Sequence, residues 1–141
     1  MALTDNTNGG RIILQGIAPV QISLSDTVEV GDMLGVSANT WVRALATTPN
    51  QVDARLVAGQ SGVSGDIIIA YPIAVIGGLT LMTKGSSVYV AEGTLKGEVT
   101  ETAPSTTGDV DAPIGISLTA TEWLAYPGLM PVYHGADHRA A

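Results

Sequence analysis

One segment of this sequence occurs twice, and its two copies indicate the fold class. The first copy is Gly31-Asp-Met-Leu-Gly-Val-Ser-Ala-Asn-Thr-Trp41, and the second, 54 residues later, is Gly85-Ser-Ser-Val-Tyr-Val-Ala-Glu-Gly-Thr-Leu95. Each copy starts with glycine and then alternates side chains in the manner of a half-buried β-strand. Ala38-Asn39 and Glu92-Gly93 follow at matching places and suit a tight turn, so a return strand should begin at the threonine after each pair. The sequence therefore predicts two related β-hairpin units.

Further matches extend this internal repeat over the rest of the chain. Two more pairs of segments keep the same order: Val52-Asp53-Ala54 with Val110-Asp111-Ala112, and Ala70-Tyr71-Pro72 with Ala125-Tyr126-Pro127. The offset stays close to 55 residues, apart from three residues inserted in the second copy. A repeat of about 55 residues thus assigns the related units to about 31–78 and 85–135.

A third, partial copy lies near the amino end. Ala18-Pro-Val-Gln-Ile-Ser-Leu24 matches Ala112-Pro-Ile-Gly-Ile-Ser-Leu118. Such a segment can supply the strand that an open sheet edge needs, either in the chain's own sheet or in a neighbour's. We expect an extended N-terminal arm over 1–17, a β-domain over 18–135 and a short tail over 136–141.

Composition agrees with an all-β fold. The 141 residues include 17 Gly and 7 Pro but no Phe, so turns are frequent and the core must be aliphatic. Short β-branched runs recur between turn signals: Arg11–Leu14, Val20–Leu24, Asp66–Ala70, Ser87–Val90 and Ile114–Leu118. Strands at this spacing predict a small β-sandwich or barrel. Only Val42 to Leu56 could hold a helical turn, and Pro49 interrupts it.

Charge and hydropathy exclude several classes of function. Thirteen acidic residues against six basic ones give a net charge of −7, which opposes binding to nucleic acid. The absence of cysteine excludes disulfides and thiolate metal sites. No apolar run reaches the length of a membrane span, and Met1 to Gly10 lacks the pattern of a signal peptide.

The sequence contains partial matches to catalytic motifs but no complete one. The nearest patterns are Ser61 and Ser64 in a Gly/Ser loop, Lys84-Gly85-Ser86 with Thr80 in place of a P-loop glycine, and the carboxylate pairs Asp109/Asp111 and Glu98/Glu101. The serines do not have the Gly-x-Ser-x-Gly spacing of a nucleophile elbow. The carboxylates lie in a segment whose composition is typical of a solvated loop rather than of a glycosidase site. The sequence predicts a protein that is not an enzyme.

Possible ligand-binding residues are few. His134, Asp137 and His138 could bind zinc or nickel, but they lie close to the carboxyl end, where a polar tail is the simpler interpretation. Trp41 and Trp123 align with aliphatic residues in the other copy, which favours core packing over ligand stacking. We expect no metal and no organic cofactor.

The repeat resembles the decoration (cement) proteins on the heads of tailed bacteriophages. The resemblance covers roughly residues 30 to 125 and is carried by Gly31-Asp-Met-Leu-Gly-Val36, Lys84-Gly-Ser-Ser-Val-Tyr-Val90 and Ala112–Leu118. It implies a small β-rich virion protein on the outer surface of the capsid, made in the host cytoplasm. It also implies a homo-oligomer, typically a trimer, which ties together subunits of the major capsid protein.

In such proteins an N-terminal arm often reaches a neighbouring subunit. The resemblance therefore places candidate interface residues here at Asp5, Asn6, Arg11, Ile12, Ile13 and Leu14. Two other classes stay open, namely a phage tail, fibre or receptor-binding β-module, and a carbohydrate-binding domain or enzyme. The former predicts exposed aromatic side chains at one tip, and the latter predicts polar groups that converge in a pocket.

Overall fold

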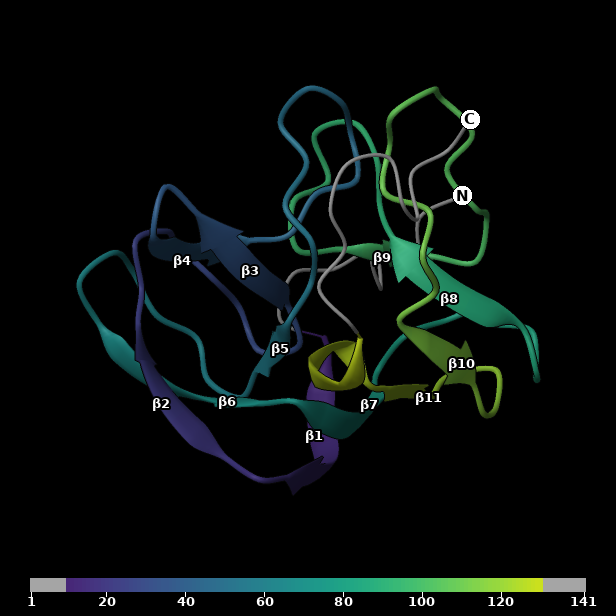
Figure 1. Cartoon of the computed structure of the whole chain (residues 1–141). Coiled ribbons are helices and arrows are strands. Elements are labelled where there is room, and N and C mark those ends of the chain that lie inside the picture. The colour runs from purple at the N-terminus through teal and green to yellow at the C-terminus, as the bar shows by residue number, and fades with distance from the viewer. Residues whose placement is uncertain (1–9, 131–141) are drawn as a thin grey trace.

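The computed structural model describes residues 10–130, which form two antiparallel sheets and almost no helix (Figure 1). The chain is therefore all-β, consistent with a small β-sandwich. Its elements are β1 (Ile12–Ile17), β2 (Val20–Ser23), β3 (Met33–Ser37), β4 (Thr40–Arg43), β5 (Leu56–Ala58), β6 (Ile67–Tyr71), β7 (Ile73–Gly77), β8 (Ser87–Val90), β9 (Val99–Thr100), β10 (Gly115–Ser117), β11 (Trp123–Ala125) and the 3₁₀ turn η1 (Pro127–Leu129).

The five-stranded sheet has the order β2-β6-β5-β3-β4 and curls almost into a barrel. Its two outer strands meet where Leu24, just after β2, forms a parallel bridge with Trp41 of β4. The amide of Ser25 donates to the carbonyl oxygen of Trp41 at 2.9 Å. The curled sheet encloses one core cluster, to which Trp41 adds its half-buried ring: Ile22, Leu24, Val28, Leu34, Leu56, Ala58, Ile68 and Ala70.

The six-stranded sheet has the order β1-β7-β11-β10-β8-β9. Its inner face carries the fully buried Ile76, Val88 and Trp123. Met33 and Val57 of the five-stranded sheet pack into the same cluster. This second core cluster therefore joins the two sheets.

A bent two-stranded ribbon also connects the sheets. β1 continues into β2 through Ala18-Pro19, while β6 continues into β7 through Pro72. β1 pairs with β7 in one sheet, and β2 pairs with β6 in the other. Figure 1 shows this ribbon along the lower boundary of the molecule, with the five-stranded sheet to the left and the six-stranded sheet to the right.

The first predicted hairpin is confirmed. β3 and β4 pair from Leu34↔Arg43 to Ser37↔Thr40. Ala38 and Asn39 both have positive φ, 50° and 65°, as a two-residue turn of this kind requires.

The prediction of a return strand that begins at Thr94-Leu95 is wrong. β8 pairs instead with β9, through Tyr89↔Thr100 and Val90↔Val99. The residues between these strands bind the first unit: the Met33 amide donates to the Gly97 carbonyl at 2.9 Å, and the Ala46 amide to the Ala91 carbonyl at 3.0 Å. Main-chain bonds to the other unit thus replace the tight hairpin.

The expected boundaries also change at the amino end. Ile12–Ile17, assigned above to an arm, forms β1 in the chain's own six-stranded sheet, because β7 has an edge there that would otherwise be unpaired. The partial third copy, Ala18–Leu24, contains β2 and likewise joins the chain's own sheet. Residues 1–9 of the expected arm lie outside the described residues, and so does the expected tail at 136–141.

Candidate functional site

The carboxylate pairs Asp109/Asp111 and Glu98/Glu101 were candidates for catalysis, and most of their members have structural partners. Glu101 accepts hydrogen bonds from the Thr83 amide at 2.8 Å and the Ser117 hydroxyl at 2.5 Å. Asp109 is 1% exposed and accepts from the Thr48 amide at 2.7 Å. The expectation of a solvated loop is wrong for Asp109, because its carboxylate supplies an acceptor for a turn of the first unit.

A different carboxyl pair, Glu92 with Asp109, is brought together by the fold. Burial raises the pKa of Asp109, but hydrogen bonds with Glu92 and Thr48 outweigh it and hold the pKa below 3.8. The hydrogen bond with Asp109 raises the pKa of Glu92 above 4.5. Beside this pair, the Gly93 amide donates to the Thr47 hydroxyl at 2.5 Å. The pair links two loops, and no spacing in the sequence predicts it.

A buried ion cluster surrounds Arg11 at the start of β1. The guanidinium Nη2 lies 2.6 Å from Oδ1 of Asp32, 3.7 Å from Glu29 and 3.6 Å from Glu98. Arg11 and Asp32 are each 3% exposed. Burial raises the pKa of Asp32 despite the adjacent guanidinium. The cluster ties β1 to the loop before β3 and to the segment before β9.

The candidate interface residues therefore separate into three groups. Arg11 is buried in this ion cluster, which differs from the expectation of a surface contact. Ile12 and Leu14 are 52% and 48% exposed, whereas Ile13 packs against the second core cluster. Asp5 and Asn6 lie outside the described residues.

The segment Ile12–Ser23 holds β1 and β2, which are outer strands of the two sheets, and we call it the uncharged edge. It contains no Asp, Glu, Lys or Arg and includes four large apolar side chains that are 43–52% exposed: Ile12, Leu14, Ile17 and Val20. Ile12 and Leu14 lie over Gly77 of β7, where a Cβ atom would be 3.1 Å from Leu14. The structure therefore presents an apolar strip at the outside of the bent ribbon.

An open cleft of about 590 Å³ lies at the turn between β3 and β4. Its lining includes Ser25, Thr40, Asn50 and Lys96, together with the ion pair of Asp26 and Arg43. Asp26 accepts from Nε of Arg43 at 3.0 Å, so much of this polar lining is already paired within the protein.

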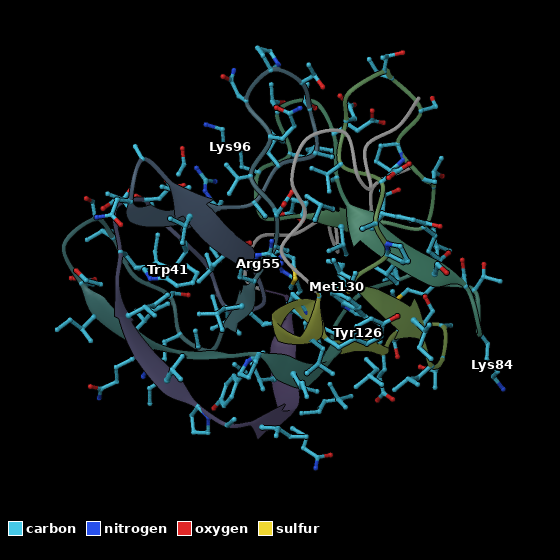
Figure 2. All side chains as sticks on the ribbon, in the orientation of Figure 1. Trp41, Arg55, Lys84, Lys96, Tyr126 and Met130 are labelled. Atoms are coloured by element: carbon cyan, nitrogen blue, oxygen red, sulfur yellow. The ribbon has the colours of Figure 1, made fainter. Side chains whose placement is uncertain are left out.

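The remaining sequence predictions concern aromatic, cationic and metal-binding residues. Trp123 is confirmed as a core residue, and Trp41 is half-buried against the first cluster; none of the aromatic side chains in 10–130 is exposed. Figure 2 shows Lys84 and Lys96 projecting at separate ends of the molecule, with Arg55 near its centre. The described cations therefore form no continuous basic stripe.

Neither a metal site nor a membrane span is found in the described part. Within residues 10–130 no group of three or more His, Asp or Glu side chains could hold a metal ion. No helix in that same range has the length and apolar character to cross a membrane. His134, Asp137 and His138 lie outside it.

Known proteins offer no further guide to this site. Comparison of the chain with protein-family models, curated proteins and solved structures finds no match.

Proposed function

We propose that this protein is a capsid decoration protein, which binds the outer surface of a tailed-phage head as a homo-oligomer and stabilises contacts between major capsid subunits. The observation that carries the proposal is the exposed, uncharged edge on a two-sheet body that shares one core. A protein that acts only by burying surface needs a rigid body and an exposed contact strip. Its stabilising effect then follows from binding the assembled shell more tightly than the loose subunits.

We also infer that the body arose by duplication of a unit of about 55 residues. The order β2-β6-β5-β3-β4 corresponds strand by strand to β7-β11-β10-β8-β9. The strand registers correspond as well. The pairs Val20↔Ala70 and Ile22↔Ile68 of the first set have the pairs Ala74↔Ala125 and Ile76↔Trp123 as their counterparts in the second. Equal strand order with equal register is improbable for two sheets of independent origin.

Main-chain hydrogen bonds between strands support the same inference. Four bonds of the first unit have counterparts in the second, with donor–acceptor distances of 2.7–3.2 Å: Gly31 N–Ala58 O with Gly85 N–Ser117 O, Ala58 N–Asp32 O with Ser117 N–Ser86 O, Arg55 N–Leu34 O with Ile114 N–Val88 O, and Leu24 N–Asp66 O with Leu79 N–Thr121 O. Gly31 and Gly85 also share a positive φ, 87° and 85°, which explains why glycine opens both copies.

A tail or receptor-binding module has less support. That class predicts exposed aromatic side chains at one tip, and the tryptophans and tyrosines in 10–130 are buried or half-buried. An enzyme would need assembled catalytic groups, whereas the carboxylates described above mainly stabilise loops. Binding to tail fibres or host cells is an outcome of the experiment below.

Cosedimentation with undecorated, expanded heads tests the proposed function. The full chain should pellet with heads in saturable amounts and raise the temperature at which they rupture. Removing residues 2–9 leaves every described contact in place, so loss of binding in that variant would assign an arm role to those residues. Removal through Ile17 would also take away β1 and Arg11, and it would test folding instead.

A charge substitution on the uncharged edge supplies the matched pair of variants. Val20→Lys, at 43% exposure, should weaken binding to heads at least tenfold, whereas Val63→Lys, at 54% exposure in the turn between β5 and β6, should not. Failure of the full chain to bind any heads, or binding to tail fibres or host cells alone, would contradict the proposal.

A further inference from the structure

β1 is the one long strand in the described part with a free edge. β6 lies between β2 and β5, and β11 lies between β7 and β10, but among residues 10–130 β1 has β7 as its only neighbour. At the other end of this sheet, β9 has two residues, both buried. In the five-stranded sheet, β2 and β4 have four residues each, and the Leu24–Trp41 bridge joins them at one end. Among the described strands, β1 thus has the longest free edge.

Within the part of the chain that the structure describes, β1 lacks most of the usual protections of a free edge. Natural edge strands carry charged side chains, proline or a covering segment. Ile12–Ile17 contains none of the charged residues and no proline, although a register shift occurs at Leu14. That extra residue directs Leu14 onto the outer face over Gly77, which widens the exposed apolar strip.

We propose that β1 pairs with β1 of a second copy of this chain, in antiparallel orientation about a two-fold axis, and so joins two six-stranded sheets. A two-fold axis between Leu14 and Gln15 places Ile12 of each copy opposite Ile17 of the other, which gives two equivalent pairs. The same register places Ile13 opposite Gly16, where the glycine leaves room for the larger side chain. The strand is therefore complementary to itself.

Charge favours a second copy at this strip. Each chain carries a net charge of −7, so most surfaces of two copies repel one another. The uncharged edge has no acidic residue from Ile12 to Ser23, and its nearest charged neighbour in sequence, Arg11, is buried in its own ion cluster. Edge-to-edge contact through β1 therefore brings no pair of carboxylates together.

The outer face of the same sheet is also apolar next to β1. Half-buried Ile73 and Val75 of β7 pair with Ile17 and Gln15, and Leu124 of β11 follows beside Val75. Contiguous exposed apolar side chains of this kind mark interaction surfaces. Together with the main-chain bonds of strand addition, this apolar face suits a reversible pair.

The proposal is independent of capsid binding, because it predicts the mass of the free protein. Sedimentation equilibrium of the full chain at micromolar concentrations should give a mean mass that rises towards twice the 14.4-kDa chain mass. Leu14→Lys should raise the dissociation constant at least tenfold, since two added charges would meet near the axis. Val63→Lys, equally exposed at a distant turn, should leave it unchanged within twofold. Circular dichroism of both variants checks that they fold.

Cross-linking tests the register itself. The chain has no cysteine, so the double variant Ile12→Cys/Ile17→Cys introduces the only thiols. Within one strand they lie roughly 16 Å apart, too far for a disulfide, whereas across the proposed axis they are directly opposite. Oxidation should give a covalent dimer, and the control Ile12→Cys/Val63→Cys should not. A monomer at all concentrations, a trimer, or a dimer insensitive to Leu14→Lys would overturn the proposal.

Discussion

The two strand sets, β2–β6 and β7–β11, share an order but differ in how they are completed. The first closes on itself through Leu24 and Trp41 and encloses its own core cluster. The second has no such closure in the described residues, because its edge strand β7 pairs with β1 and its inner face packs on Met33 and Val57 of the first set. One set is self-contained, and the other depends on its neighbour.

The cause of this difference is visible in the two hairpins. In the first set a two-residue turn returns the chain directly from β3 to β4. In the second, eight residues lie between β8 and β9, and they bond to Met33 and Ala46 across the interface. The two sets thus share a strand order, while the longer loop of the second set adds contacts between them.

The largest expected effect tests that shared core. Trp123→Ala removes a side chain that is 1% exposed in the second cluster, and it should lower the free energy of unfolding by about 3–5 kcal/mol. Trp41 then remains as the only tryptophan and reports on the first set. Its fluorescence should follow the same shifted urea transition as circular dichroism. A Trp41 transition that keeps the wild-type midpoint would show that the sets unfold independently.

A similar but smaller loss is expected at the ion cluster that fixes β1. Arg11→Met leaves the carboxylate of Asp32 buried without its counter-ion, which should cost about 3 kcal/mol at neutral pH. Adding Asp32→Asn should recover part of the loss, because a neutral amide needs no counter-charge. Both values come from urea unfolding. Equal stability of the wild type and Arg11→Met would mean that β1 is held by main-chain pairing alone.

A third effect separates equivalent positions in the two hairpins. Gly35 in β3 corresponds to Tyr89 in β8, 54 residues later. A Cβ atom on Gly35 would collide with the main-chain oxygen of Asp53, because the Leu45–Val52 bridge brings this segment across β3. Gly35→Ala should therefore cost about 1–3 kcal/mol.

The matched change Tyr89→Ala removes half-buried surface without creating a clash. It should lower the free energy of unfolding less than Gly35→Ala, by about 1 kcal/mol. The reverse ranking in thermal or urea unfolding would contradict the close approach of Asp53.

How far the sequence predicts this molecule depends on whether the information is local. Alternation and turn residues locate β3, β4 and β8 and the turn at Ala38-Asn39, since each is set within a few residues. The place of β1 and the return from β8 depend on which edges are free after folding, which no local pattern records. Likewise Glu92 and Asp109 meet only through tertiary packing, so spacing suggested other carboxylate pairs.

The smallest expected effect concerns the closure that the second set lacks. Asp26 and Arg43 form an ion pair beside the Leu24–Trp41 bridge, with both side chains partly exposed. Burial alone raises the pKa of Asp26, but the hydrogen bonds and charge of Arg43 outweigh it and lower the pKa below 3.8. The pair therefore stabilises the fold above pH 3.8, and this contribution is lost as pH falls through the lowered pKa.

Arg43→Gln should accordingly cost about 0.5–1 kcal/mol at pH 7, as for other partly exposed pairs. The substitution should cost almost nothing once Asp26 is protonated. The unfolding free energies of the wild type and Arg43→Gln should therefore approach each other as the pH falls from neutral to acid. Lys84→Gln, on the second set and without an ion pair to Asp or Glu in residues 10–130, is the control for loss of one positive charge. A constant difference between wild type and Arg43→Gln at all pH values would show that the arginine acts through its aliphatic stem, and that the first set closes without help from charge.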